Sequence, residues 1–423
     1  MIKILHIADI HLGMKNYGTV DRQTGLNSRF LDFLHSFDYA VDYTLKNKVD
    51  FFFFAGDAFK TREPSPTQQR EFAKRIKKIA AAGIPVVSII GNHDLPNATG
   101  EADTLEIYKT LAVDNVYISQ KPELLTFSQS AAGRWTLGKN KKSQNIFQIA
   151  TLPWISKNAL ATKKEYQRKT IAEVDKLVVK KVSNLVKDLA RRINTSQPAV
   201  LIAHATVAGA VFGAERKVYV GNDAVLPLSL FIQPWDYVAL GHLHKHQILN
   251  QNPPVVYAGS IERVDFGEAK EEKGFVAVKI NGKRKAKQAN FEFISTPARK
   301  FIPITVEIKE RDKNPTAKVC SAVKKHNLKE AVVKLNIVLP ETSADLLEED
   351  KVRRALEPAY YIAGIKKEII KIQRPKSDVT SAESITPLEA LNQYFSLRKK
   401  KSQAVKEATK LAQGIIEEVN QEH

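Results

Sequence analysis

Aspartate, asparagine and histidine residues recur at the ends of short apolar runs in the first 250 residues of the chain. These residue types can bind a metal ion through a side-chain oxygen or an imidazole nitrogen. One run ends in three histidines, in the segment ALGHLHKH from Ala239 to His246. Side chains two positions apart in an extended backbone point the same way, so His242 and His244 are predicted to face one point. The full set is Asp9, His11, Asp57, Asn92, His93, His204, His242 and His244.

The runs that carry these residues are predicted to be buried strands of a layered α/β fold. They are apolar on both faces, as strands covered by helices are, and span residues 3–9, 50–57, 84–94, 199–205, 236–244 and 255–260. Segments 66–83 and 157–193 have apolar residues at helical spacing. Because ligand sites form where the carboxyl ends of such strands meet, we expect the metal-binding residue types to converge.

Composition indicates a globular protein with an acidic partner. The chain has 423 residues, of which 43% are apolar, and is long enough for about three domains. Lys and Arg total 65 against 46 Asp and Glu, and the net charge of +19 favours an acidic polymer or surface. A single cysteine, Cys320, excludes an internal disulfide framework. No apolar run approaches the roughly 20 residues of a membrane span, so we expect a cytoplasmic protein without membrane association.

The sequence changes in character after about residue 290. Segments 300–309 and 331–340 are predicted to be strands with helices around them, which indicates a small α+β domain over residues 290–375. Residues 376–385 have the composition of a linker. Thr386 then begins a helix, with Pro387 at its first position and Glu389 completing a capping box.

The last segment, residues 386–423, contains two amphipathic helices whose apolar faces are too short to bury each other well. These faces either dock onto a partner or pack back on the body. The candidate contact residues are Leu391, Tyr394, Phe395, Leu411 and Ile415.

In this order, the motifs D-x-H, G-D, G-N-H-D, H and G-H-x-H resemble the calcineurin-like metallophosphoesterase superfamily over roughly residues 1–285. The resemblance implies an α/β sandwich of central β-sheets flanked by helices and a centre with two divalent metal ions. One ion would be held by Asp9, His11, Asp57 and His244, and the other by Asp57, Asn92, His204 and His242. Asp57 suits the bridging position because a carboxylate has two oxygens to share. The ligand types admit manganese, iron or zinc, and the resemblance favours Mn²⁺.

Three residues near these motifs have roles that the sequence defines less closely. His93 is the candidate catalytic residue, which would contact the phosphate and donate a proton to the leaving oxygen; the alternative is that it only orients Asn92 or its loop. Asp94 either orients His93 or caps the turn. No place among the ligands remains for His246, which we predict to be a surface or substrate-loop residue.

The sequence around the motifs narrows the resemblance. HIADIHLGMKNYG, AGDAFKTREPSPTQQREFAKRI, IGNHDLP and YAGSIERVDFGE resemble SbcD-type nuclease subunits of SbcCD DNA-repair complexes. This implies a metal-dependent DNA phosphodiesterase, a double-strand exonuclease and single-strand or hairpin endonuclease, acting in double-strand break repair. It also implies that residues 386–423 bind an SbcC-like coiled-coil ATPase. The resemblance also implies that two copies of the chain form a homodimer through helices near residues 66–115, and that this homodimer is part of a heterotetramer.

The chain departs from the phosphatase pattern GDxxDR three residues after Asp57, where Lys60 stands. Phosphatase chemistry is therefore less expected. Lys60 and Arg62 either contact a DNA phosphate or are helix-capping or solvent-exposed residues. Two other functions stay open: a small-molecule or cyclic-nucleotide phosphodiesterase, which should lack the small domain and the last helices, and a DNA end-binding scaffold without catalysis.

Overall fold

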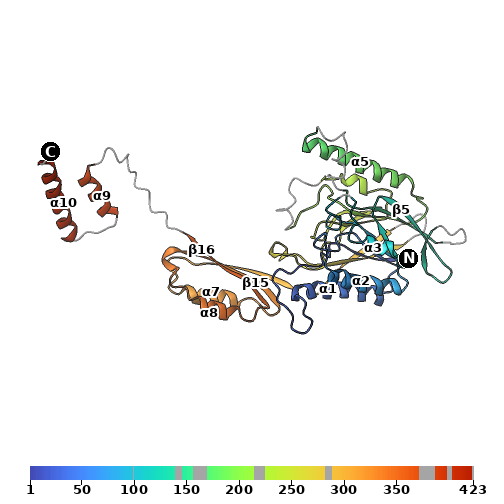
Figure 1. Cartoon of the computed structure of the whole chain (residues 1–423), viewed down its shortest axis with the longest axis horizontal. Helices are drawn as coiled ribbons and strands as arrows, with labels where there is room; N and C mark the ends of the chain where they lie inside the picture. Colours follow the sequence, from blue (N-terminus) through green and yellow to red (C-terminus); the bar gives the residue numbers. More distant parts are fainter. Residues whose placement is uncertain are drawn as a thin grey trace.

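The structure, a computed structural model, describes residues 1–98, 100–138, 145–155, 169–213, 224–281, 288–370, 386–397 and 403–421. A larger body contains two β-sheets, and a smaller body with a third sheet follows it along the chain. Figure 1 shows α1 and α2 along one side of the larger body and α5 on the opposite side.

The first sheet has six strands in the order β13-β12-β1-β2-β3-β4. From β1 to β4 the strands run parallel, whereas β12 is antiparallel to β1 and β13 is antiparallel to β12. The strands are β1 (Ile2–Ile7), β2 (Phe51–Phe54), β3 (Val86–Ile89), β4 (Val116–Ser119), β12 (Gly274–Asn281) and β13 (Gln288–Ser295).

The second sheet has seven strands in the order β10-β11-β9-β8-β7-β5-β6. Its centre, from β11 through β9 and β8 to β7, is parallel, and its outer strands are antiparallel to their neighbours. The strands are β5 (Glu123–Gln129), β6 (Trp135–Leu137), β7 (Ile146–Leu152), β8 (Ala199–His204), β9 (Tyr237–Gly241), β10 (Gln247–Gln251) and β11 (Pro254–Tyr257).

The four phenylalanines of β2 show how the layers are built. Phe51 and Phe53 belong to the core between the two sheets, where Phe51 packs on Phe147 with ring centroids 5.0 Å apart. Phe52 and Phe54 point the other way, because successive side chains alternate along a strand, and join the core beneath α1 and α2. A third core lies between the second sheet and α5. The prediction of central sheets flanked by helices is confirmed.

The flanking helices begin and end where local sequence signals stand. They are α1 (Ser28–Lys46), α2 (Pro66–Ala81), α3 (Glu106–Thr110) and α5 (Ile171–Arg191), with 3-10 turns η2 (Leu228–Phe231) and η3 (Phe266–Glu268). A capping box of Ser65 and Gln68 begins α2. Another, of Thr170 and Glu173, begins α5, so this helix is shorter than the predicted segment 157–193; residues 156–168 lie outside the described part of the chain.

The smaller body alternates strands and helices. It contains β14 (Lys300–Glu307), α7 (Pro315–Lys324), β15 (Ala331–Pro340), η4 (Glu341–Ser343), α8 (Glu349–Leu356) and β16 (Tyr361–Ile370). All three strands are parallel, so the unit is β-α-β-α-β and not the predicted α+β arrangement; parallel neighbours require helical crossovers. Since β13 still belongs to the first sheet, we propose that the domain boundary lies between β13 and β14, later than residue 290.

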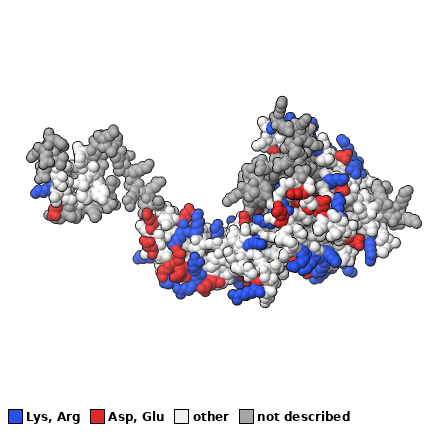
Figure 2. Space-filling model, in the orientation of Figure 1, with Lys and Arg blue, Asp and Glu red and all other residues white. Residues whose placement is uncertain are grey.

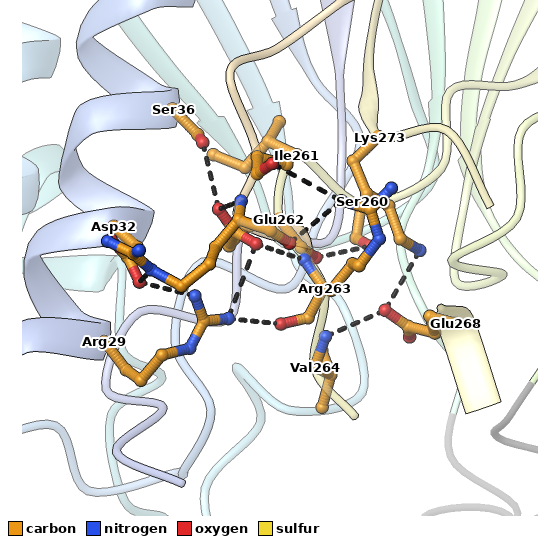
Figure 3. A network of polar contacts seen from close by, with 12 residues as sticks. Arg29, Asp32, Ser36, Ser260, Ile261, Glu262, Arg263, Val264, Glu268 and Lys273 are labelled. Atoms are coloured by element: carbon orange, nitrogen blue, oxygen red, sulfur yellow. Dashed lines mark hydrogen bonds and ion pairs between the residues drawn. The ribbon is translucent and has the colours of Figure 1, made fainter. Parts of the chain in front are cut away.

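A buried network of charges joins the two bodies (Figure 3). Arg299, just before β14, donates to Asp32 of α1 at 2.6 Å, and Arg29 donates to the same carboxylate at 2.6 Å. The Glu262 carboxylate accepts from the Arg299 backbone N–H at 3.0 Å and from Arg29 at 3.4 Å. Arg29 and Glu262 are shielded from water, with side chains 1% and 0% exposed, so the hydrogen bond from the Arg299 backbone to Glu262 helps to hold β14 against the larger body.

The last two helices, α9 (Pro387–Leu397) and α10 (Gln403–Gln421), contact each other and are drawn away from the rest of the chain in Figure 1. The predicted start of α9 is confirmed, since Glu389 accepts from the Thr386 backbone N–H at 3.0 Å. The predicted linker, residues 376–385, lies outside the described residues. Among the residues described, no helix is long and apolar enough to cross a membrane.

We predict that His6, on β1, makes the fold sensitive to acid. The side chain is fully buried, and burial lowers its pKa to about 3 from an ordinary 6.5. The unfolded chain therefore takes up a proton below pH 6.5 that the folded chain refuses, so this contribution to stability is present above pH 6.5 and is lost as the pH falls.

Urea unfolding at pH 7.5 and pH 5.5 measures the effect. The wild type should lose about 1.4 kcal/mol more than His6→Gln over this interval, which is the linkage expected of one such group. Equal losses in the two proteins would contradict the prediction.

Candidate metal centre

The predicted ligands meet where strands of both sheets end. Asp9 and His11 follow β1, Asp57 follows β2, and Asn92 follows β3 of the first sheet. His204 closes β8 of the second sheet, and His242 and His244 follow β9. Neighbouring parallel strands direct their carboxyl ends to one edge, and the two sheets place these edges together.

One group forms around His11. Its Nε2 lies 2.9 Å from His244 Nε2 and 3.6 Å from Asp57 Oδ2. Candidate ligand atoms of Asp9, His11 and His244 all lie within 4.8 Å of one another. This group contains the side chains predicted to hold the first ion.

A second group forms around Asn92. Its Oδ1 lies 3.0 Å from His204 Nε2 and 3.0 Å from His242 Nδ1. His204 Nε2 also lies 3.5 Å from Asp57 Oδ2. Asp57 therefore contacts both groups, as the predicted bridging position requires; ligation itself stays a prediction.

The donor set suits two divalent cations. The Nδ1–H of His204 donates to the carbonyl oxygen of Ala55 at 2.7 Å, which leaves Nε2 facing the other side chains. A Cβ added at Gly91 would lie 2.1 Å from Asp57 Oδ1, so only glycine admits the carboxylate there. Nitrogen and carboxylate donors without a thiolate suit manganese, iron or zinc.

Burial shifts the ionisation of this cluster strongly. Burial raises the pKa of Asp9 to about 7, although the charges of His204 and His244 act in the opposite direction. Burial would also raise the pKa of Asp57, yet the neighbouring histidines, His204 first, hold it well below its usual value. Burial and the neighbouring His244 lower the pKa of His11 well below its usual value. A cluster of this kind gains from cations that compensate its carboxylates.

The backbone at the centre is left-handed at several of the predicted ligands. Its φ angles are 51° at Asp9, 47° at His11, 61° at Asp57 and 101° at His242. Since non-glycine residues rarely adopt such angles, this is strain of the kind found at functional sites. The predicted extended backbone at His242 and His244 is therefore wrong: β9 ends at Gly241, and a strained loop aims both side chains.

Asp94 caps the turn that carries Asp57, which decides between its two predicted roles. Its carboxylate accepts from the backbone N–H groups of Asp57 at 2.8 Å, Ala58 at 3.0 Å and Gly91 at 3.0 Å. Burial, together with the nearby Asp57, raises the pKa of Asp94 to about 6. Asp94 thus ties the loop after β2 to the loop after β3.

His93 lies at the same cluster, with its ring edge-on to His11 at 4.8 Å between centroids. Its Nδ1–H donates to the carbonyl oxygen of Lys60 at 2.9 Å, and its backbone N–H donates to Asp57 at 2.8 Å. Lys60 contributes to the site through this carbonyl, while its side chain is exposed. Arg62 is exposed too and donates to Asn97 at 3.4 Å.

His246 is not the surface or substrate-loop residue that the sequence predicts. Its ring stacks on Phe293 with centroids 4.2 Å apart, and its Nδ1–H donates to the carbonyl oxygen of Tyr257 at 2.8 Å. Burial lowers its pKa. The side chain thus contacts Tyr257 of β11 and Phe293 of β13, and it is partly buried between them.

Lys and Arg side chains gather along α2 on the surface (Figure 2). The residues there include Arg70, Lys74 and Lys78, whose side chains are 57%, 61% and 53% exposed. They pair with Glu71 and Asp42, so part of the local charge is neutralised. The positive charge that these three side chains present to solvent is therefore smaller than their number suggests.

The family model for calcineurin-like phosphoesterases matches residues 2–246. The chain belongs to this family. Every element that supplies a predicted ligand lies within the matched residues. The matched residues include β1 to β9, whereas β10 to β13, which complete the two sheets, follow residue 246.

Within this family, the chain is similar to SbcD and Mre11 proteins. The phosphoesterase is 27% identical to the SbcD component of the nuclease SbcCD of Escherichia coli (strain K12), over 64% of this chain and 63% of that protein. It is 24% identical to the DNA double-strand break repair protein Mre11 of Saccharolobus solfataricus, over 61% and 53%. The chain thus spans less than two thirds of the length of these curated relatives. A dimetal phosphatase from Danio rerio aligns over 70% of this chain and 99% of its own, with 10% identity and a TM-score of 0.38.

Two functional candidates escaped the sequence reasoning. Glu268 and Lys273 stand behind His244, and the Nδ1 of His244 lies 2.7 Å from Glu268 Oε1. Glu268 is the last residue of the segment VDFGE, which is part of the sequence that resembles SbcD-type subunits. The resemblance assigned no role to this glutamate. Spacing alone does not reveal such a contact, because the two side chains lie 24 residues apart.

We predict opposite outcomes for two neighbouring histidines. His244→Ala should weaken Mn²⁺ binding, measured by calorimetry, because it removes a nitrogen from the first group. His246→Ala should keep Mn²⁺ binding but lower the free energy of unfolding by about 1–3 kcal/mol, through loss of ring stacking and a hydrogen bond. Equal loss of Mn²⁺ binding in both variants would show that the assignment of the two residues is wrong.

Proposed function

We propose that this phosphoesterase is a metal-dependent nuclease that hydrolyses DNA phosphodiester bonds in double-strand break repair. The observation that carries the proposal is the pair of donor groups that share Asp57, with His93 beside them. The names of similar proteins, a component of a nuclease and a double-strand break repair protein, support DNA as the substrate. The net charge of +19 supports a polyanion.

The side chains at the centre have distinct tasks in this proposal. Asp9, His11, Asp57 and His244 would hold one divalent ion, probed as Mn²⁺, and Asp57, Asn92, His204 and His242 the other. When bound, two such ions provide Lewis-acid activation of water and clamp the phosphoryl oxygens.

In this proposal, His93 donates a proton to the leaving oxygen. Donation from Nδ1 to the Lys60 carbonyl fixes the plane of the ring, so the transferable proton is the one that Nε2 carries when both ring nitrogens are protonated. Because the backbone N–H of His93 is bound to Asp57, ring and bridging carboxylate keep a fixed relation. Lys60 and Arg62, exposed beside this loop, would contact phosphates of the DNA backbone.

The two alternative functions receive less support. A small-molecule or cyclic-nucleotide phosphodiesterase should lack the smaller body and helices α9 and α10, which this chain has. A binding scaffold without catalysis does not require a full set of converging donors or a strained backbone beneath them. Exonuclease and endonuclease activities both belong to the proposal.

Replacing His93 should separate chemistry from metal binding. We expect His93→Ala to digest linear double-stranded and hairpin DNA about 100-fold more slowly or worse in Mn²⁺, since a lost general acid has an effect of this order. Mn²⁺ affinity should stay within a few-fold. Digestion is followed on labelled DNA in a gel.

The matched control is His35→Ala, an exposed histidine on α1. It should keep both rate and affinity. If the wild type with Mn²⁺ leaves all DNA intact while cleaving a simple phosphodiester, the nuclease proposal fails. If His93→Ala digests DNA at the wild-type rate, its role as the acid fails.

The last helices are proposed to bind an SbcC-like coiled-coil ATPase, in a heterotetramer built on a homodimer of this chain. Leu391, Tyr394 and Phe395 lie on α9, and Leu411 and Ile415 on α10. Tyr394, Leu411 and Ile415 are 48%, 68% and 56% exposed, so these apolar surfaces are open to a partner.

A charge placed in that surface should disrupt the complex. Leu411→Asp with Ile415→Asp should abolish co-purification with an SbcC-type ATPase expressed alongside, and leave Mn²⁺-dependent cleavage by the isolated chain unchanged. The control Glu407→Gln, on the same helix, should co-purify normally. Retention of the ATPase by the double variant would contradict the assignment of this surface.

A further inference from the structure

A pair of opposite charges is buried directly behind the candidate metal centre. The Nζ of Lys273 lies 3.0 Å from Glu268 Oε2, and the side chains are 0% and 1% exposed. Figure 3 shows the Glu268 carboxylate turned toward Lys273 and the backbone nitrogen of Val264. Burial of such a pair is costly unless each polar atom is satisfied, so the arrangement calls for a role beyond stability.

Glu268 determines which nitrogen of His244 carries the proton. Its Oε1 lies 2.7 Å from His244 Nδ1. A carboxylate only accepts hydrogen bonds, and a neutral imidazole has one N–H, so the proton lies on Nδ1. The lone pair of Nε2 then faces the cluster, where His11 Nε2 lies 2.9 Å away.

Lys273 holds this geometry from behind. Its ammonium group donates to the Glu271 carboxylate at 2.8 Å and to the backbone carbonyl of His244 at 3.1 Å, and it forms an ion pair with the Glu268 carboxylate. The ammonium group is therefore surrounded by three oxygens. Lys273 therefore fixes the backbone of His244 and the carboxylate that binds its ring.

Both oxygens of Glu268 are thereby committed. Oε1 accepts from His244, while Oε2 forms an ion pair with Lys273 and accepts from the Val264 backbone N–H at 2.8 Å. With donors on both sides of the carboxylate, Glu268 is held as the acceptor for the Nδ1–H of His244.

We propose that Glu268, held by Lys273, is a positioning residue that keeps His244 in the Nδ1–H tautomer with Nε2 aimed at the metal. The inference rests on the proposed metal-binding function. A carboxylate that orients a histidine ligand in this way raises metal affinity, and removing such a partner lowers it about 10- to 100-fold.

The substitution Glu268→Gln tests the tautomer directly. Lys273 and the Val264 N–H are both donors, so they hold the amide oxygen of the glutamine on their side. Its NH₂ group then faces His244 Nδ1 and requires an acceptor there, which moves the imidazole proton to Nε2. The variant should therefore present N–H, rather than a lone pair, to the metal.

Two measurements on the full chain detect the shift of the His244 proton from Nδ1 to Nε2. In ¹⁵N-histidine-labelled protein without metal, the His244 signals, assigned from His244→Ala, should show an Nδ1–H ring in the wild type and an Nε2–H ring in Glu268→Gln. Calorimetric titration with MnCl₂ should show affinity lowered about 10- to 100-fold in the variant.

The matched control is Glu262→Gln. Glu262 is as deeply buried and lies on the same segment, but it binds Arg29, Ser36 and backbone N–H groups rather than a predicted ligand. It should keep the His244 tautomer and Mn²⁺ affinity. If Glu268→Gln fails to fold because Lys273 loses its buried carboxylate and keeps only Glu271, the double variant Glu268→Gln with Lys273→Met removes both buried charges and should show the same loss.

The outcomes separate the two proposals. A wild type that binds no Mn²⁺ would overturn the metal centre itself. A wild type that binds Mn²⁺, with a folded variant of unchanged tautomer and affinity, would overturn the role of Glu268 and leave the proposed function standing. An equal loss in Glu262→Gln would also overturn it, because the effect would then come from any buried charge on this segment.

Discussion

The buried carboxylate of Asp57 is stabilised by groups from both sheets, and neither sheet alone supplies all of them. Burial of a single charge is costly, and here the compensating groups come from both sides of the sandwich. His11 and the His93 backbone N–H belong to the first sheet's loops, whereas His204 belongs to the second sheet. The packing of phenylalanines between the sheets is therefore also what brings the halves of the site together.

This placement accounts for the unusual backbone around the centre. Loops after β1, β2 and β9 adopt left-handed angles at Asp9, His11, Asp57 and His242 because the side chains must reverse toward a single point. Asp94 offsets part of this strain through its three backbone hydrogen bonds. Strands buried on both faces provide the rigid base on which strained loops persist.

Sequence patterns predicted the layers and the convergence of the donors, since runs apolar on both faces and polar residues at their ends are local features. They could not predict what depends on the path of a loop. His242 and His244 are aimed by a strained turn rather than by strand alternation, and His246 turns inward onto Phe293. Short apolar runs likewise do not specify whether neighbouring strands pair parallel or antiparallel. The parallel pairing of β14, β15 and β16 could therefore not be predicted.

The segment from Ser260 to Lys273 shows why contacts distant in sequence matter most here. Glu262 binds Arg29 and the Arg299 backbone, which join the two bodies, and Glu268 binds His244. Between them, Phe266 packs on Phe301 of β14 with ring centroids 5.0 Å apart. The segment from Ser260 to Lys273 thus binds a predicted metal ligand and also contacts the smaller body. Because η3 is only one turn long, the contact that Phe266 makes with β14 and the contact that Glu268 makes with His244 lie within three residues of each other.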